Sequence, residues 1–93
     1  ITDLVVVAQR EPTVDEVNEA FQKAAADRLN GILDYTDEPL VSTDIVAHPA
    51  SVIIDGRSTL VIGNLVKTFG WYDNEWGFSN RLAELVALVG ERL

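Results

Sequence analysis

Two side chains near the end of the chain, Asn74 and Phe78, have residue types and a spacing that could hold a ligand. A primary amide carries an acceptor oxygen and a donor nitrogen, so Asn74 can pair reciprocally with a carboxamide on a ligand. Phe78 follows one helical turn later, which on a helix puts its ring on the same face as the amide. The pair therefore indicates binding chemistry, and we assign no catalytic residue.

Each of these residues also has a purely structural interpretation. Asparagine is a common helix N-cap, so Asn74 could simply accept hydrogen bonds from backbone amides. Phe78 could pack between the helix and a sheet together with Leu82 and Leu85. From the residues alone, both interpretations stay open.

The elements that must position these residues are a strand and a helix that meet in a polar, aromatic-rich segment, residues 71–81. A mostly apolar strand is expected from Leu65 to Trp71, and the apolar residues after it recur at helical spacing. The final helix is expected from about Glu75 to Glu91, with Asp73 or Asn74 as its cap. Groups at a strand end are free of ladder pairing and face solvent or ligand, so we expect the site here.

Earlier in the chain, a valine-rich run and a capping pattern predict a strand followed by a helix. Leu4 to Ala8 is continuously apolar, which is typical of a central strand covered on both faces. Thr13 and Glu16 have the spacing of a capping box, and Asn30-Gly31 supply a left-handed stop. We expect this helix to pack its apolar stripe on the sheet.

The middle of the chain predicts a hairpin. Ser51–Ile54 and Thr59–Ile62 flank the turn-forming segment Asp55–Ser58, so the two runs should pair in antiparallel fashion. Gly63-Asn64 then forms either a tight turn or a bulge. Before the hairpin we expect a long connection with one short strand near Leu40–Ser42. The predicted fold class is α+β, with a mixed, largely antiparallel sheet and two helices packed on one face.

Composition limits the classes of partner. The 93 residues are 47% hydrophobic, which suits one small domain with a thin core. A net charge of −8 argues against nucleic acid, because a binder needs Lys and Arg to displace phosphate counterions. No apolar run is long enough to predict a membrane span, and we expect a cytoplasmic protein. The chain contains no cysteine and therefore no thiol nucleophile.

The remaining titratable residues do not predict a second site. His48 precedes Pro49 in an irregular stretch without a Cys or Ser partner, and we interpret it as a loop residue. Four acids nearby do not have the alternating spacing of a calcium loop, so we predict a solvated acidic edge and no metal. These acids are Asp34, Asp37, Glu38 and Asp44.

The segment Trp71–Arg81 resembles the closing motif of the phosphorylating glyceraldehyde-3-phosphate dehydrogenases. Three earlier segments resemble parts of the same family in the same order: Thr13–Asn18, Gly31–Thr36 and Glu38–Asp44. The resemblance covers nearly the whole chain. It implies that residues 1–93 are the C-terminal portion of the catalytic domain, and that the N-terminal NAD-binding Rossmann domain lies outside this chain.

The resemblance also implies a function. The family oxidises glyceraldehyde 3-phosphate with phosphate and NAD or NADP to 1,3-bisphosphoglycerate, and it forms homotetramers. Its asparagine matching Asn74 holds the nicotinamide carboxamide and fixes which face of the ring meets the substrate. The family usually has tyrosine at the position of Phe78, beside the nicotinamide, so this chain keeps the ring but lacks the hydroxyl.

The family reaction passes through a thioester and requires a cysteine, which this chain lacks. We therefore expect the chain to be inactive by itself, and to self-associate through sheet edges and apolar faces. A relative acting on erythrose 4-phosphate remains a possible parent, and the choice between NAD and NADP stays open. The alternative from another class is a non-catalytic acidic α+β interaction or regulatory domain.

Overall fold

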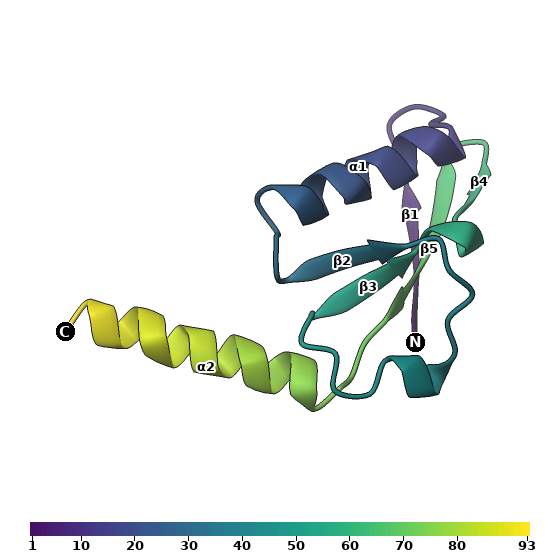
Figure 1. Ribbon diagram of the computed structural model, residues 1–93. Coiled ribbons are helices and arrows are strands. Elements are labelled where there is room, and N and C mark those ends of the chain that lie inside the picture. The colour runs from purple at the N-terminus through teal and green to yellow at the C-terminus, as the bar shows by residue number, and fades with distance from the viewer.

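The computed structural model describes all residues from 1 to 93 and shows one sheet, with one helix against it and a second helix extending away (Figure 1). In chain order the elements are β1 (Thr2–Val7), α1 (Val14–Ala26), β2 (Leu33–Thr36), the 3-10 turn η1 (Ser42–Asp44), β3 (Val52–Asp55), the 3-10 turn η2 (Gly56–Ser58), β4 (Leu60–Ile62), β5 (Leu65–Trp71) and α2 (Trp76–Glu91).

Strand β5 is the centre of the sheet. Along one side it pairs antiparallel with β1, from Thr2 opposite Gly70 to Val7 opposite Leu65. Along its other side it pairs antiparallel with β4 and then with β3, and β2 lies parallel to β3 at the far edge. The α+β class and the mixed, largely antiparallel sheet are therefore confirmed.

The predicted hairpin between β3 and β4 is wrong. Both strands pair with the same side of β5: Ile54 lies opposite Gly70, and Val61 lies opposite Val66. The turn η2 interrupts this edge without reversing the chain, and the Asp55 carboxylate caps it by accepting from the Arg57 amide at 3.2 Å. The chain reverses direction only after β4.

That reversal is at Gly63-Asn64, which settles the choice left open between a turn and a bulge. Ile62 pairs directly with Leu65, so the two residues between them form a tight hairpin turn. Gly63 has φ +59, a left-handed conformation that glycine adopts without strain.

The central position predicted for the first strand is also wrong. β1 pairs only with β5, and all six of its residues are exposed; its four apolar residues range from 45% at Val6 to 71% at Val7. A valine-rich run indicates a strand but does not specify its neighbours, because pairing depends on segments far away in the sequence. In this chain β1 is an edge with an apolar surface.

The connection after α1 differs from the prediction in two ways. The strand expected near Leu40–Ser42 is absent, and the chain instead forms the 3-10 turn η1. The strand that does form is β2, four residues long, which is too short to show a clear period. It is held in place by pairing with β3 in parallel register, beginning at Leu33 opposite Val52.

Helix α1 begins as predicted and lies against β2 (Figure 1). The capping box is confirmed, because the Glu16 amide donates to the Thr13 hydroxyl at 3.1 Å and the Thr13 amide donates to Glu16 Oε1 at 3.4 Å. Asn18 joins the helix to the turn η2 by donating to the Gly56 carbonyl at 2.9 Å. The helix ends at Ala26, and Gly31 with φ +81 completes the turns that follow.

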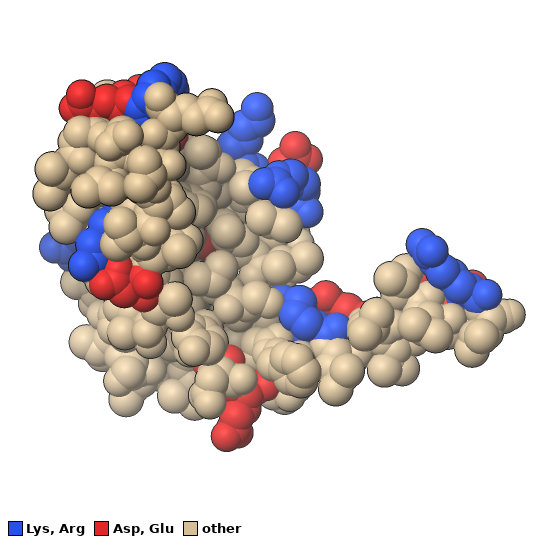
Figure 2. All heavy atoms as spheres, turned by 180° about the vertical axis from the view of Figure 1, so that it is seen from behind, with Lys and Arg blue, Asp and Glu red and all other residues tan.

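Helix α2 does not pack on the sheet, which corrects the prediction of two helices on one face. Gly77 is its only buried residue, and every residue from 82 onward is exposed. Figure 2 shows the helix projecting from the body of the molecule, with few charged side chains along it. Neither helix combines the length and apolarity that crossing a bilayer requires.

The best-buried cluster lies next to the root of α2. It consists of Ile45, Ala50 and Ile53, with Leu40 and Trp71 packed against it. The cluster brings the segment after η1, the start of β3 and the end of β5 together. The junction between β5 and α2 therefore lies next to the best-buried part of the chain.

Two glycines of α2 give a matched test of how the helix is seated. A Cβ at Gly77 would lie 2.8 Å from the Ala50 carbonyl oxygen, whereas a Cβ at Gly90 would meet nothing within 4 Å. We expect Gly77→Ala to lower the free energy of unfolding by about 1 to 3 kcal/mol through overpacking. We expect Gly90→Ala to raise helicity and to stabilise by up to about 1 kcal/mol. Urea unfolding and circular dichroism measure both, and equal effects would contradict the seating.

Candidate functional site

Asp73 organises the junction between β5 and α2. Its Oδ1 accepts hydrogen bonds from the backbone amides of Glu75 at 3.0 Å and Trp76 at 2.9 Å, and its carbonyl accepts from the Gly77 amide at 3.0 Å. Asp73 thus supplies the capping that the first turn of the helix needs. Of the two cap candidates in the sequence, the structure uses Asp73.

Asn74 is therefore free of the capping role. The residue is exposed, and no backbone or side-chain group of the chain makes a hydrogen bond with its carboxamide. An amide with both its donor and its acceptor available can pair with a carboxamide on a ligand. The structure leaves Asn74 able to do so.

The surface around Asn74 is hollowed. An open hollow of about 340 Å³ lies between the junction and the η1 segment. Its lining comprises Ser42, Ile45, Val46, Tyr72, Asp73, Asn74 and Glu75. Carboxylates and an amide from one side face small and apolar side chains from the other, so the hollow has one polar wall.

Phe78 lies outside this hollow, and its side chain is 67% exposed. The interpretation of Phe78 as core is wrong, because its supposed partners Leu82 and Leu85 are also about half exposed. The ring sits on a projecting helix with no cover from the rest of the chain. Its apolar face is available to a ligand or to another surface.

Residues 1–74 match the family model described as the glyceraldehyde 3-phosphate dehydrogenase C-terminal domain. The chain belongs to this family. The match to this model ends at residue 74, so helix α2 lies beyond it.

Relatives with the name of this family are similar to the whole chain. The chain is 56% identical to glyceraldehyde-3-phosphate dehydrogenase 1 of Streptomyces avermitilis, over 100% of this chain and 28% of that protein. It is 54% identical to glyceraldehyde-3-phosphate dehydrogenase of Mycobacterium tuberculosis, over 100% of this chain and 27% of that protein. The chain thus spans less than a third of the length of these relatives, and its family resemblance is confirmed.

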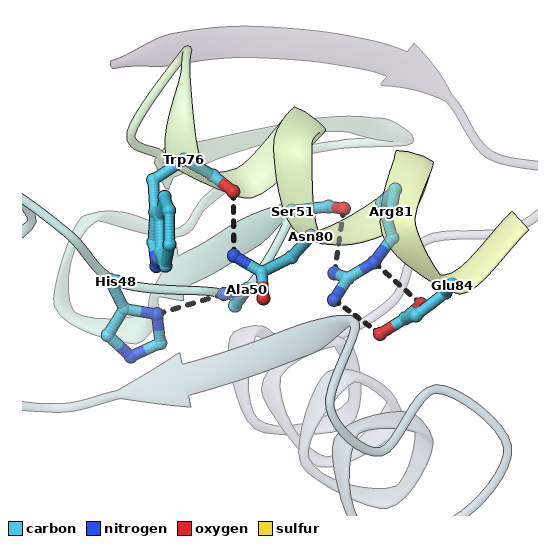
Figure 3. Close-up of polar contacts among 7 residues, drawn as sticks. All are labelled: His48, Ala50, Ser51, Trp76, Asn80, Arg81 and Glu84. Atoms are coloured by element: carbon cyan, nitrogen blue, oxygen red, sulfur yellow. Dashed lines mark hydrogen bonds and ion pairs between the residues drawn. The ribbon is translucent and has the colours of Figure 1, made fainter. Parts of the chain in front are cut away.

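The sequence did not predict a second anchor of α2. Arg81 donates from Nη1 to the Ser51 hydroxyl at 3.1 Å, and from Nε and Nη2 to the Glu84 carboxylate at 2.9 and 2.8 Å (Figure 3). The spacing of Arg81 and Glu84 was a visible signal for a pair on one helix face. The contact with Ser51 had none, because it joins segments 30 residues apart.

His48 has a structural role in the same region. Its Nδ1 accepts from the Ala50 amide at 3.2 Å, as Figure 3 shows, and its Nε2 faces Asp34 at 3.5 Å. The nearby acids are engaged separately: Asp37 accepts from the Tyr35 hydroxyl at 2.7 Å, and Asp44 accepts from the Val41 amide at 2.9 Å. No group of three or more potential ligands converges on a metal position.

The capping bonds give Asp73 a measurable pH dependence. Backbone amides, first that of Trp76, then those of Ala47 and Glu75, hold the pKa of Asp73 below its usual value. The ionised carboxylate therefore stabilises the fold above its unfolded pKa of about 4, and this contribution is lost as pH falls through the folded pKa. We expect Asp73→Asn to lower Tm most at neutral pH, with the gap to wild type narrowing below about pH 4.

Glu75→Gln is the matched control, because it removes one charge from the same turn. The hydrogen bond between the Glu75 backbone amide and the Asp73 carboxylate is kept. The gap of Glu75→Gln to wild type is expected to stay smaller than that of Asp73→Asn at neutral pH. Thermal unfolding by circular dichroism between acid and neutral pH measures both. An Asp73→Asn gap that does not change with pH would contradict the assignment.

Proposed function

We propose that residues 1–93 are the cofactor-facing, C-terminal part of the catalytic domain of an NAD(P)-dependent glyceraldehyde-3-phosphate dehydrogenase. The parent enzyme oxidises glyceraldehyde 3-phosphate with phosphate to 1,3-bisphosphoglycerate, and its dinucleotide-binding domain lies outside these residues. Family membership and the names of relatives that match the full chain support this proposal. They favour it over the alternative of an acidic interaction domain.

The observation that carries the proposal is the free carboxamide of Asn74 beside the hollow. Asp73 takes the capping role, so Asn74 can hold the carboxamide of a nicotinamide ring through two reciprocal hydrogen bonds. When bound, the nicotinamide supplies the hydride-accepting carbon. By fixing the carboxamide, Asn74 selects which face of the ring is turned toward the substrate.

Phe78 adds an apolar surface to this proposal. Its exposed ring lies one helical turn from Asn74 and can contact the flat face of an aromatic ligand. Phenylalanine offers no hydroxyl, so this chain makes no phenol hydrogen bond at the position. We assign Phe78 to packing against the cofactor only.

The groups that make and break bonds lie elsewhere in this proposal. The chain has no cysteine, and its one histidine is held by the Ala50 amide and Asp34. We place the nucleophile, its base and the phosphate sites outside residues 1–93. Selectivity between NAD and NADP, and between glyceraldehyde 3-phosphate and erythrose 4-phosphate, is placed there too.

Asn74→Ala in the intact dehydrogenase tests the proposal directly. Loss of two hydrogen bonds to the ring carboxamide is expected to lower kcat by about 10- to 100-fold, equivalent to about 1.4 to 2.7 kcal/mol of transition-state stabilisation. Face selectivity of hydride transfer should fall as well, because the ring is no longer oriented. Steady-state kinetics and transfer from a stereospecifically deuterated cofactor measure these effects.

Asn80→Ala is the matched control. It removes the same kind of side chain six residues further on, within α2, but the Asn80 amide already donates to the Trp76 carbonyl at 2.8 Å. We expect kcat and face selectivity close to wild type. Phe78→Tyr should also keep selectivity, since the ring is retained. Unchanged selectivity in Asn74→Ala would refute the proposed role.

The isolated chain gives a second test. Purified residues 1–93 are expected to show no phosphate- and cofactor-dependent oxidation of the aldehyde, because the chain contains no thiol to form the acyl intermediate. Formation of reduced cofactor, followed by absorbance, measures this. Turnover above a blank without protein would contradict the proposed division of roles.

We also propose that this chain associates with copies of itself, as expected for part of a homotetramer. The free edge of β1 has unpaired backbone groups and exposed apolar side chains, including Val5 at 54% and Val7 at 71%. Light scattering at increasing concentration should show dimers or larger species.

Val5→Lys is expected to weaken this association, because a charge on an edge strand discourages pairing. Val46→Lys is the control, since Val46 is at least as exposed as Val5, 71% against 54%, but lies in the loop after η1. A stable monomer at the highest concentration would contradict self-association.

A further inference from the structure

The Asp73 carboxylate does more than cap a helix. While Oδ1 accepts from the Glu75 and Trp76 amides, Oδ2 accepts from the Ala47 amide at 2.8 Å. Helix capping uses the amides of the first turn only. The third bond reaches a segment 26 residues earlier in the chain, so Asp73 ties the root of α2 to the loop after η1.

The amide at the other end of this bond belongs to an unusual residue. Ala47 has φ +64 and is the only non-glycine residue of the chain with positive φ. An L-residue in this conformation costs about 1 to 2 kcal/mol and persists only where its surroundings hold it. The hydrogen bond to Asp73 holds Ala47 on one side, and the His48 amide donating to the Ile45 carbonyl at 3.0 Å holds it on the other.

This arrangement connects the site to the core. Ile45 is 3% exposed and belongs to the best-buried cluster. The Ala47 amide therefore stands at a fixed place relative to the core, and Asp73 takes its own position from that amide. Asn74 is the next residue, so the position of its backbone is set by that of Asp73.

Nothing else in the chain restrains the Asn74 side chain. It is exposed and unpartnered, and the two further anchors of α2, the close approach of Gly77 to Ala50 and the bond from Arg81 to Ser51, do not involve this side chain. Pairing with a carboxamide requires donor–acceptor distances within a few tenths of an ångström. A displacement of about 1 Å at the reacting group can cost about 100-fold in rate.

We propose that Asp73 is the positioning residue of this site: by joining the Ala47 amide to the first turn of α2, it sets where the Asn74 carboxamide projects. This inference rests on the proposed role of Asn74 and extends it to the group that aims the amide. Asp73 itself touches no ligand in this proposal.

A double-mutant cycle in the intact dehydrogenase tests the proposal. The wild type is compared with Asp73→Ala, Asn74→Ala and the double variant for kcat, cofactor KM and face selectivity of hydride transfer. We expect Asp73→Ala to lower kcat about 10-fold and to reduce face selectivity. Because it acts through Asn74, the double variant should be no worse than Asn74→Ala alone.

The outcomes separate this inference from the function on which it rests. If Asn74→Ala lowers selectivity but Asp73→Ala leaves it at the wild-type value, or if the two losses in kcat multiply, positioning is overturned and the role of Asn74 stands. If Asn74→Ala changes nothing, both proposals fail together. A purely structural role for Asp73 would lower the amount of active enzyme without changing face selectivity.

Asp73→Asn provides a variant for the case in which Asp73→Ala does not fold. The carboxamide keeps one acceptor oxygen for the helix amides at Glu75 and Trp76, but its NH2 group cannot accept from Ala47. We expect its Tm to lie closer to wild type than that of Asp73→Ala. Its face selectivity should fall as far as that of Asp73→Ala, and wild-type selectivity in this variant would overturn the proposal.

Discussion

The arrangement of the junction depends on one carboxylate that accepts three backbone hydrogen bonds. Asp73 joins the end of β5, the first turn of α2 and the loop after η1. These three amides belong to the exposed residues Ala47, Glu75 and Trp76, and each finds in Asp73 a hydrogen-bond partner within the protein. Because Asp73 accepts these hydrogen bonds, the carboxamide of the neighbouring Asn74 remains available to bind a ligand.

The rest of the chain consists of a small, well-buried core, called here the firm region, and large exposed apolar surfaces, called the uncovered surfaces. The firm region is the cluster around Ile45, Ala50 and Ile53, on which α2 is seated through the close approach of Gly77 to Ala50. The uncovered surfaces are β1 and most of α2, whose apolar side chains are exposed. A site placed at the boundary between them is held by the core on one side and open to another surface or ligand on the other.

Predictions from the sequence were most successful where the signal lies within a few residues. The capping box at Thr13 and Glu16, the strand Leu65–Trp71 and the last helix all formed within about one residue of expectation. They failed where the partner is distant. The run Leu4–Ala8 became an edge strand, and the two runs around η2 paired with β5 instead of with each other.

For the site, the sequence by itself determined that an amide and a ring stand at the start of a helix after a strand, because propensity, periodicity and capping chemistry act over short distances. It also identified the dehydrogenase family, which the comparisons confirmed. Only the tertiary structure decided that Asp73 and not Asn74 caps the helix, and that Ala47 supplies the third bond. Both Asp73 and Asn74 are good cap residues, so local chemistry could not choose between them, and the bond from Ala47 joins segments 26 residues apart, whose contact no local pattern encodes.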